Sequence, residues 1–127
     1  MMEVPMTVKR IVANIAALNL SEAKRFYEEI LGLDLMMDHG WIATYGNDAQ
    51  MSVQISIASQ GGSDTPVPDV SIEVDDVDAV DAVLEKMELA GFPIEYGPAD
   101  EPWGVRRFYV RDPFGKVVNI LAHTSRS

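Results

Sequence analysis

The sequence consists of two similar halves, and this internal repeat constrains the fold more than any other feature. Each half begins with an apolar strand, continues with an amphipathic helix that ends at a glycine, and finishes with three short strands. The glycines are Gly32 and Gly91, and a tryptophan opens a later strand in each half, at Trp41 and Trp103. Two copies are too few for a solenoid, so a repeat of roughly fifty residues predicts two βαβββ modules packed as one domain.

Hydrophobic periodicity places the elements of the first module, residues 8–58. A strand is expected over residues 8–17, followed by a helix of about three turns with Ser21 as its N-cap. The apolar stripe of this helix comprises Ala23, Phe26, Tyr27, Ile30 and Leu31. Gly32 is placed for a left-handed C-terminal cap, and turn signals separate strands over residues 33–38, 41–45 and 51–58.

A linker rich in Gly, Ser and Pro, residues 59–68, leads to the second module, residues 69–123. Its first strand, residues 69–74, ends at Asp75 and Asp76, which are suited to cap the second helix. That helix runs to Gly91, and strands are expected over residues 94–96, 103–110 and 117–123, with a loop over residues 97–102. Residues 1–127 are therefore predicted to form one α+β domain, in which a curved mixed sheet surrounds a cup and the helices cover its outer face.

The composition excludes several classes of function. The chain has no cysteine and carries 20 acidic against 10 basic side chains, a formal net charge of −10. Without cysteine there is no disulfide and no thiolate nucleophile, which fits a reducing cytoplasm. The first residues contain neither a basic leader nor a long apolar run, so neither a signal peptide nor a membrane span is predicted. The negative charge repels phosphate backbones and anionic lipid, so nucleic acid and membranes are not expected partners.

Strand alternation assigns one face of each strand to the core and the other face to the cup. The cup side chains are polar or aromatic, which is the usual composition of a small-molecule site. The expected ligand-binding residues are Trp41, Tyr45, Gln54, Asp69, Glu73, Trp103, Arg107, Tyr109 and Asn119. A bulge would exchange Arg106 for Arg107 at this face, and in a flat sheet the same side chains would face water.

Two pairs of ionisable side chains, one of carboxylates and one of histidines, are interpreted separately. Asp69 and Glu73 are spaced to form a carboxylate pair for acid–base chemistry, or to attract a cation. His39, beside Gly40 in a turn, and His123, at the end of the last strand, are interpreted as surface residues.

Residues 101–115 form an alternating strand closed by the turn Asp112-Pro113-Phe114-Gly115. With this strand and turn, the chain resembles the vicinal-oxygen-chelate superfamily, which includes glyoxalase I, extradiol dioxygenases, fosfomycin-resistance transferases and bleomycin-binding resistance proteins. The resemblance covers residues 8–123 and implies paired βαβββ modules. It also implies a divalent metal held by four His, Glu or Gln side chains, at positions that correspond here to Val12, Gln54, Asp69 and Asn119.

These four residues are a poor set of metal ligands. Val12 cannot coordinate, and Asn119 lacks the anionic oxygen that a hard divalent ion prefers. Asp69 and Gln54 alone are too few for a facial triad. No metal and no other cofactor is therefore predicted, and no catalytic residue is assigned.

Without a metal, the sequence favours binding over catalysis, although it leaves open whether a reaction occurs. The leading hypothesis is metal-independent binding of a small aromatic molecule, which would sequester an antibiotic or a toxic metabolite, as the resemblance to bleomycin-resistance proteins implies. Trp41 and Trp103 would stack on the ligand, Asp69 or Glu73 would attract a cationic group, and Arg107 would instead favour an anionic one. The alternatives are a metal-dependent lyase, transferase or dioxygenase, and an interaction module without a ligand. The resemblance also implies a homodimer, with exchange of modules left open.

Overall fold

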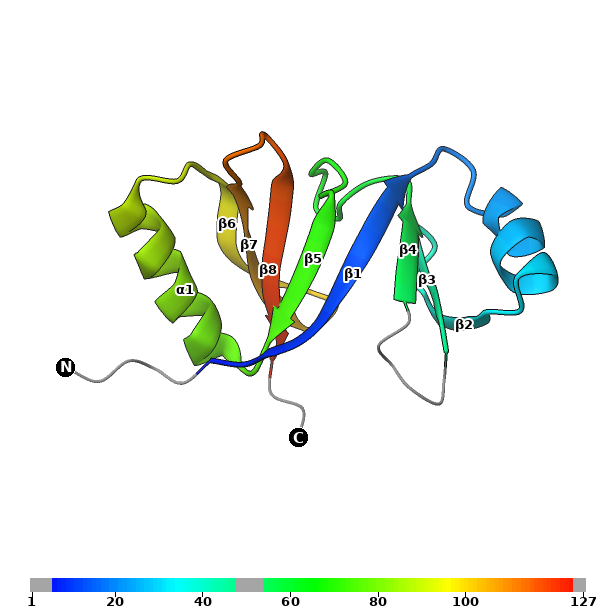
Figure 1. The fold of residues 1–127 in the computed structure, drawn as a ribbon, viewed down its shortest axis with the longest axis horizontal. Coiled ribbons are helices and arrows are strands. Elements are labelled where there is room, and N and C mark those ends of the chain that lie inside the picture. Colours follow the sequence, from blue (N-terminus) through cyan, green and yellow to red (C-terminus); the bar gives the residue numbers. More distant parts are fainter. Residues whose placement is uncertain (1–5, 48–53, 125–127) are drawn as a thin grey trace. The chain divides into compact units, whose positions relative to one another are not determined.

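The computed structural model describes residues 6–47 and 54–124, and the chain falls into two compact units. One unit comprises residues 12–67, and the other comprises residues 68–127 together with residues 1–11. Strand β1 (Val8–Ala16) contributes residues to both units (Figure 1). No helix in the described parts of the chain has the length and apolar character needed to span a bilayer.

The unit of residues 12–67 is built on antiparallel strands and the second part of β1. β2 (Asp34–Asp38), β3 (Ile42–Gly46) and β4 (Gln54–Ala58) pair antiparallel in this order, and β1 joins β4 in parallel. Residues 51–53 of the expected last strand lie outside the described residues. The first half therefore has the expected order of a strand, a helix and three strands.

The helix of this unit differs from the expectation. Element η1 (Lys24–Ile30) is a π-helix of seven residues rather than an α-helix of three turns. Asn19 serves as the local acceptor in place of Ser21, since the backbone N–H and hydroxyl of Ser21 donate to Asn19 Oδ1 at 3.1 and 2.6 Å. Gly32 is left-handed as predicted, with φ of 76°.

The predicted apolar stripe of the first helix is wrong beyond Tyr27. Ala23 and Tyr27 pack against the core of their unit, whereas Ile30 and Leu31 are 62% and 56% exposed. A π-turn closes through an i→i+5 bond, so it carries later side chains away from the row that α-helical spacing defines.

The unit containing residues 68–127 has a complete βαβββ order. Its elements are β5 (Val70–Val74), α1 (Val77–Ala90), β6 (Ile94–Glu101), β7 (Val105–Arg111) and β8 (Val117–His123). β5 pairs with β8 in parallel, β8 with β7 and β7 with β6 antiparallel, and β1 lies beside β5. Both units thus mix parallel and antiparallel pairs, and the predicted α+β class is confirmed.

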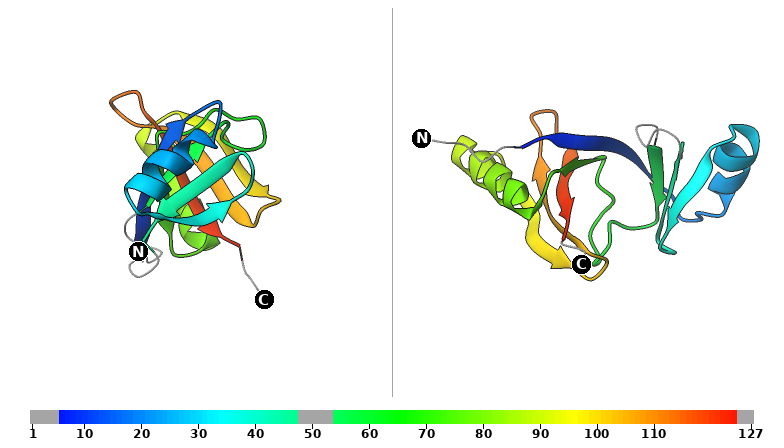
Figure 2. Two further views of the ribbon diagram at one scale, coloured as in Figure 1. Left: turned by 90° about the vertical axis from the view of Figure 1, so that its right-hand side faces the viewer. Right: turned by 90° about the horizontal axis from the view of Figure 1, so that it is seen from below.

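Helix α1 begins and ends where its sequence predicts. Asp76 has an extended backbone, and its Oδ1 accepts the N–H of Ala79 at 2.9 Å. Gly91 ends the helix in the left-handed conformation. α1 covers one face of the strands of its unit (Figures 1 and 2). The buried core between helix and strands comprises Val74, Ala79, Val80, Phe108, Val110, Ile120 and Ala122.

Strand β6 is longer than predicted, because residues 97–101 of the expected loop continue the pairing with β7, with shifts of register. Gly97 permits this, since its φ is 86° and a Cβ there would lie 2.7 Å from the carbonyl oxygen of Arg107. The extension brings Glu101 opposite Val105. The turn between β7 and β8 matches the expectation, with Asp112 Oδ1 accepting the N–H groups of Phe114 and Lys116 at 2.8 and 2.9 Å.

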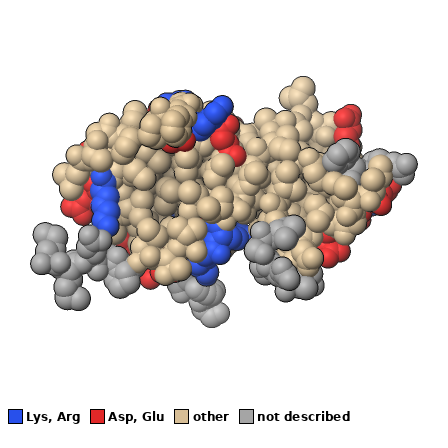
Figure 3. Space-filling model, viewed as in Figure 1, with Lys and Arg blue, Asp and Glu red and all other residues tan. Residues whose placement is uncertain are grey.

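Two arginines of β7, Arg106 and Arg111, form ion pairs on the surface with neighbours of opposite sign. On the face drawn in Figure 3, uncharged side chains cover most of the area, and the basic side chains form small separate groups. Arg106 bonds to Asp81 at 2.9 Å and to Asp100 at 3.1 Å, and Arg111 bonds to Glu95. The hydrogen bond that Arg106 donates to Asp81, followed by the one it donates to Asp100, raises the pKa of Arg106.

Candidate functional site

Side chains of β5, β8, β7 and β6 that point away from α1 form a polar and aromatic surface, which we call the polar face. The strand register aligns Ser71 with Asn119, and Asn119 with Tyr109. Two residues further along, Leu121 lies between Glu73 and Arg107, and His123 then lies opposite Val105. The polar residues of this face are Ser71, Glu73, Tyr96, Glu101, Arg107, Tyr109, Asn119 and His123. Of the predicted ligand-binding residues, it brings together Glu73, Arg107, Tyr109 and Asn119.

Arg107 is the centre of the polar face at β6 and β7. Its Nε donates to Glu101 Oε2 at 2.7 Å, and each of these two side chains is only 4% exposed. Its Nη1 donates to the hydroxyl of Tyr109 at 3.0 Å, and the hydroxyl of Tyr96 donates to Glu101 Oε2 at 2.7 Å. The guanidinium carbon lies 5.0 Å from the ring centroid of Trp103, 5.0 Å from that of Tyr109 and 5.2 Å from that of Tyr96. One carboxylate and three aromatic rings therefore compensate the charge of Arg107 within its own unit.

The structure decides which of the two neighbouring arginines lies on the polar face. Arg107 is aligned with Leu121 on this face, whereas Arg106 is on the opposite side of β7, where it bonds to Asp81 of α1. Arg107 therefore lies on the face away from the helix, which the sequence left open between the two arginines, and its role in binding a ligand stays a prediction.

Asn119 lies on β8, an inner strand of the polar face, and only the nitrogen of its side-chain amide has a hydrogen-bond partner among the described residues. The residue is 7% exposed, and its Nδ2 donates to Ser71 Oγ at 3.1 Å. Within the described ranges, its Oδ1 is a buried side-chain acceptor without a hydrogen-bond partner. An unpaired buried acceptor costs about 1–3 kcal/mol, so a donor on a bound molecule would be favourable here.

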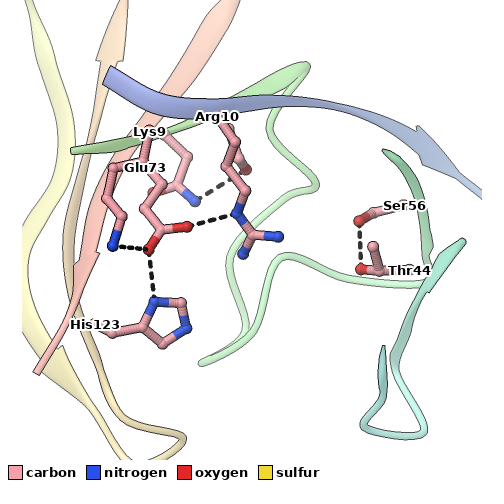
Figure 4. A network of polar contacts seen from close by, with 8 residues as sticks. Lys9, Arg10, Thr44, Ser56, Glu73 and His123 are labelled. Atoms are coloured by element: carbon pink, nitrogen blue, oxygen red, sulfur yellow. Dashed lines mark hydrogen bonds and ion pairs between the residues drawn. The ribbon is translucent and has the colours of Figure 1, made fainter. Parts of the chain in front are cut away.

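Glu73 gathers basic side chains at the β5 edge of the polar face. Its Oε1 accepts from Arg10 Nε at 2.5 Å, and its Oε2 bonds to His123 Nδ1 at 2.9 Å (Figure 4). The Nζ of Lys9 lies 4.0 Å from Oε2. Burial opposes ionisation of Glu73, but the hydrogen bonds and charges of His123 and Arg10 outweigh it and hold the pKa of its carboxyl below the usual value. Glu73 is thus an anchored carboxylate at neutral pH.

Asp69 and Glu73 do not form the carboxylate pair that their spacing suggested. Asp69 stands just before β5, where its Oδ2 accepts the N–H of Val117 at 2.8 Å and its own N–H donates to the carbonyl of Val117 at 2.9 Å. The expectation is wrong because each carboxylate has partners of its own. Asp69 joins the start of β5 to β8 through the backbone, and Glu73 is held by cations.

The positions expected for metal ligands do not provide a ligand set. Val12 is buried and apolar, the carboxylate of Asp69 is bonded to a backbone amide, and the amide nitrogen of Asn119 is bonded to Ser71. In residues 6–47 and 54–124, no three His, Cys, Asp or Glu side chains form a group that could hold a metal ion. Divalent ions of this kind prefer anionic oxygen or imidazole ligands, so these residues do not fit the metal that the resemblance implies.

In the unit of residues 12–67, Tyr45 lies on the opposite side of the sheet from the one expected. β3 pairs with β4 so that Tyr45 is opposite Ile55, and Tyr45 packs in the core with Ala23 and Ile57. Its ring lies 6.0 Å from that of Tyr27, and burial, followed by nearby carboxylates, raises its pKa. The assignment to the ligand face is wrong because a shift of one residue in strand register exchanges the two faces.

Other side chains of this unit occupy the side that Tyr45 was expected to share. Thr44 and Ser56 are buried opposite one another and share a hydrogen bond of 2.7 Å (Figure 4). Gln54 is half-buried at the start of β4, opposite Gly46. Trp41 precedes β3, and its ring lies 6.3 Å from the ring of His39. Ligand contacts of Trp41 and Gln54 stay predictions.

Sequence reasoning missed three residues, namely Tyr96 and Glu101 on the polar face and Arg10 beside it, and it also missed the contact of His123 with Glu73. Gly97-Pro98 signals a turn, which concealed that β6 continues to Glu101. His123 is exposed as expected, with 54% of its side chain accessible, yet one ring nitrogen contacts a buried carboxylate. Its position four residues after Asn119 on one strand was the available signal, since alternate residues share a face.

Known structures share this fold at low sequence identity. A structure described as NAD-dependent benzaldehyde dehydrogenase from Legionella pneumophila matches with a TM-score of 0.72 and 15% identity, covering 90% of this chain and 99% of that one. The Mn(II)-bound glyoxalase from Novosphingobium aromaticivorans matches with a TM-score of 0.61 and 16% identity, covering 94% of this chain and 41% of that one. The methylmalonyl-CoA epimerase from Mycobacterium tuberculosis matches with a TM-score of 0.61 and 13% identity, covering 93% of this chain and 88% of that one. At these identities the similarity shows the fold alone.

The family is shown by the sequence itself. No curated protein sequence gives a significant match. The model of the Glyoxalase/Bleomycin resistance protein/Dioxygenase superfamily, however, matches residues 9–120, which is most of the chain. The protein therefore belongs to the Glyoxalase/Bleomycin resistance protein/Dioxygenase superfamily.

Proposed function

We propose that the protein binds a small, uncharged aromatic molecule on the polar face without the help of a metal ion. The observation that carries this proposal is the unpaired Oδ1 of Asn119, a buried acceptor in the middle of a face with aromatic side chains. Apolar and aromatic walls with a few placed polar groups are typical of small-molecule sites. The acceptor of Asn119 calls for an N–H or O–H donor on the ligand.

Local charge supports an uncharged ligand. Arg107 is already paired with Glu101, so it does not call for an anion. Glu73 is already paired with Arg10 and His123, so it does not call for a cation. A charged ligand would have to break one of these pairs, which is costly for buried groups.

Independence from metal is supported by the chemistry of three of the four ligand positions, since only Gln54 is of a residue type in the implied set. A valine, a carboxylate bonded to the backbone and an asparagine replace groups that would hold a divalent ion. The corresponding role in the cell is sequestration of an antibiotic or a toxic metabolite, a role suggested by the bleomycin-resistance proteins in the family description.

Fluorescence titration tests the binding, because the chain has two tryptophans, Trp41 and Trp103. The protein is titrated in EDTA with flat aromatic compounds that are uncharged, cationic or anionic, and separately with bleomycin. We expect saturable binding of an uncharged compound with an N–H donor, loss of the signal in Trp103→Phe and retention of it in Trp41→Phe. Asn119→Leu should weaken binding roughly two- to tenfold, as expected for one hydrogen bond. Equal affinity of Asn119→Leu and wild type would refute the role of the unpaired acceptor.

Native mass spectrometry tests the independence from metal. Exposure to nickel, manganese or iron(II) should give no stoichiometric adduct, and the ligand adduct should form equally well before and after chelation. A metal adduct on which ligand binding depends would overturn the proposal. The same spectra test the expected homodimer, which would appear at twice the mass of 14.0 kDa.

A second candidate is an interaction module that binds no small molecule. The observation in its favour is that Tyr96, Trp103 and Tyr109 already surround the guanidinium of Arg107, so aromatic surface is occupied by the protein itself. This candidate predicts no saturable response to any compound in the titration.

A further inference from the structure

His123 and Glu73 form a carboxylate–imidazole pair that ligand binding at Asn119 does not use. The carboxylate of Glu73 only accepts hydrogen bonds, so Nδ1 of His123 carries the proton of the 2.9 Å contact. In the neutral ring the other nitrogen, Nε2, then bears the lone pair. Figure 4 shows the ring extending away from Glu73, and 54% of the side chain is accessible. The pair therefore presents a basic nitrogen on the polar face.

The orientation of this pair is fixed from the β1 side. Arg10 donates to the oxygen of Glu73 that His123 does not contact, and Lys9 lies 4.0 Å from the shared oxygen. Asp75, two residues beyond Glu73, accepts the backbone N–H of Thr7, and Val105 opposite His123 carries no charge. The groups facing the imidazole thus hold it in one tautomer and leave Nε2 for a substrate.

We infer that His123, positioned by Glu73, is a general base that removes an acidic C–H proton from an uncharged aromatic molecule held on the polar face. In this step the C–H bond breaks and the proton passes to Nε2. The electron pair moves onto an electronegative atom of the same molecule, and Nε2 later returns the proton to water. No oxidant, reductant or metal enters this balance. The inference rests on the proposed binding of such a molecule, but it also requires His123, which binding alone does not require.

The first test reads the tautomer of the histidine. The chain has only two histidines, so nitrogen-15 spectra of the rings are assigned with His39→Gln and His123→Gln. We expect the neutral His123 to carry its proton on Nδ1, and Glu73→Gln to weaken this preference while Glu73→Asp preserves it. A neutral His123 that carries its proton on Nε2 in the wild type would overturn the inference.

The second test uses 5-nitro-1,2-benzisoxazole, an uncharged flat aromatic probe. Because it has no N–H or O–H donor for Asn119, we expect it to bind the polar face more weakly than a ligand that has one. When a base takes its ring C–H proton, the electron pair forms the nitrile, the N–O bond breaks and a coloured phenolate is released. General bases contribute about 10²- to 10⁴-fold, so we expect His123→Gln to lower kcat/KM at least about tenfold in EDTA, while His39→Gln leaves it unchanged. Glu73→Gln should lower kcat more than it changes KM. Equal rates in His123→Gln and wild type, with circular dichroism showing both folded, would overturn the inference.

Binding of the unreactive isostere 5-nitroindazole separates this failure from that of the proposed function. If the isostere binds and the rate does not depend on His123, the general base is refuted and the binding site stands. If neither binding nor turnover is seen, both are refuted for uncharged aromatic molecules. Binding that survives in His123→Gln together with a lost rate supports both.

Discussion

Replacing Arg107 by methionine should be the most destabilising single change on the polar face. The guanidinium and the carboxylate of Glu101 are each 4% exposed and 2.7 Å apart, so removing one leaves the other buried without its counter-charge. Such losses cost about 3–5 kcal/mol. A domain of this size has a free energy of unfolding of about 5–15 kcal/mol, so the variant should remain folded in water but with much of its stability lost.

The neighbouring Arg106→Met is a matched control. Arg106 also bonds to carboxylates, but Asp81 and Asp100 are 51% and 68% exposed. Pairs of this kind contribute about 0–1 kcal/mol. The same side chain is therefore removed from adjacent residues of one strand, and the main difference is burial.

Equilibrium unfolding in urea measures both variants, with circular dichroism as the probe. We expect Arg107→Met to lower the midpoint strongly at an unchanged m-value and Arg106→Met to move it slightly. The double variant Arg107→Met/Glu101→Gln removes both charges and keeps an acceptor for Tyr96, so it should recover about half or more of the loss. Equal costs for the two arginines, or no recovery in the double variant, would show that the buried pair does not stabilise the fold.

Three further changes test separate features of the structure. Gly97→Ala should lower the free energy of unfolding by more than about 1 kcal/mol, because the added Cβ would lie 2.7 Å from a backbone oxygen at a φ of 86°. In the same urea unfolding, the control Gly40→Ala should cost less, since no atom lies within 4 Å of its added Cβ. Equal costs would contradict the close approach at Gly97. Asp76→Ala should lower the free energy of unfolding by about 1 kcal/mol, because it removes the N-cap of α1, and the exposed Asp78→Ala is the control. Amide exchange in the first turn of α1 should become faster in Asp76→Ala. An unchanged exchange rate would contradict the role of the cap. The pKa of Glu73 is lowered in the folded state, so its contribution to the free energy of unfolding should be fully present well above the unfolded pKa of about 4.3 and should disappear as pH falls through the folded pKa. The urea midpoint of the wild type should therefore drop more on acidification than that of Glu73→Gln. Parallel pH profiles of the two midpoints would contradict this linkage.

Local patterns in the sequence predicted the second half better than the first. Asp76, Gly91 and Asp112 are capping and turn residues whose preferred conformations do not depend on distant contacts, and all three lie where expected. The type and face of the first helix were predicted from an apolar stripe, since the cap residues Ser21 and Gly32 define only its ends. A stripe does not distinguish α from π spacing over seven residues, so Ile30 and Leu31 were placed wrongly.

The candidate site was predictable only where strand alternation sufficed. Alternation placed Glu73, Arg107, Tyr109 and Asn119 on one face, because β5, β7 and β8 keep a regular register. The prediction for Tyr45 is wrong because the side of the sheet on which this side chain lies depends on the pairing of β3 with β4, which the sequence of β3 does not specify. The partners of these residues, such as Arg10 for Glu73 across 63 positions of the chain, come from the tertiary fold.

The division of β1 between the two units affects how the repeat can be taken apart. Residues up to Ile11 belong with the second half, and they supply Lys9 and Arg10 to Glu73 and the N–H of Thr7 to Asp75. A fragment that begins at the linker, residues 59–68, would therefore contain the buried carboxylate of Glu73 without Lys9 and Arg10, the basic side chains that contact it from β1.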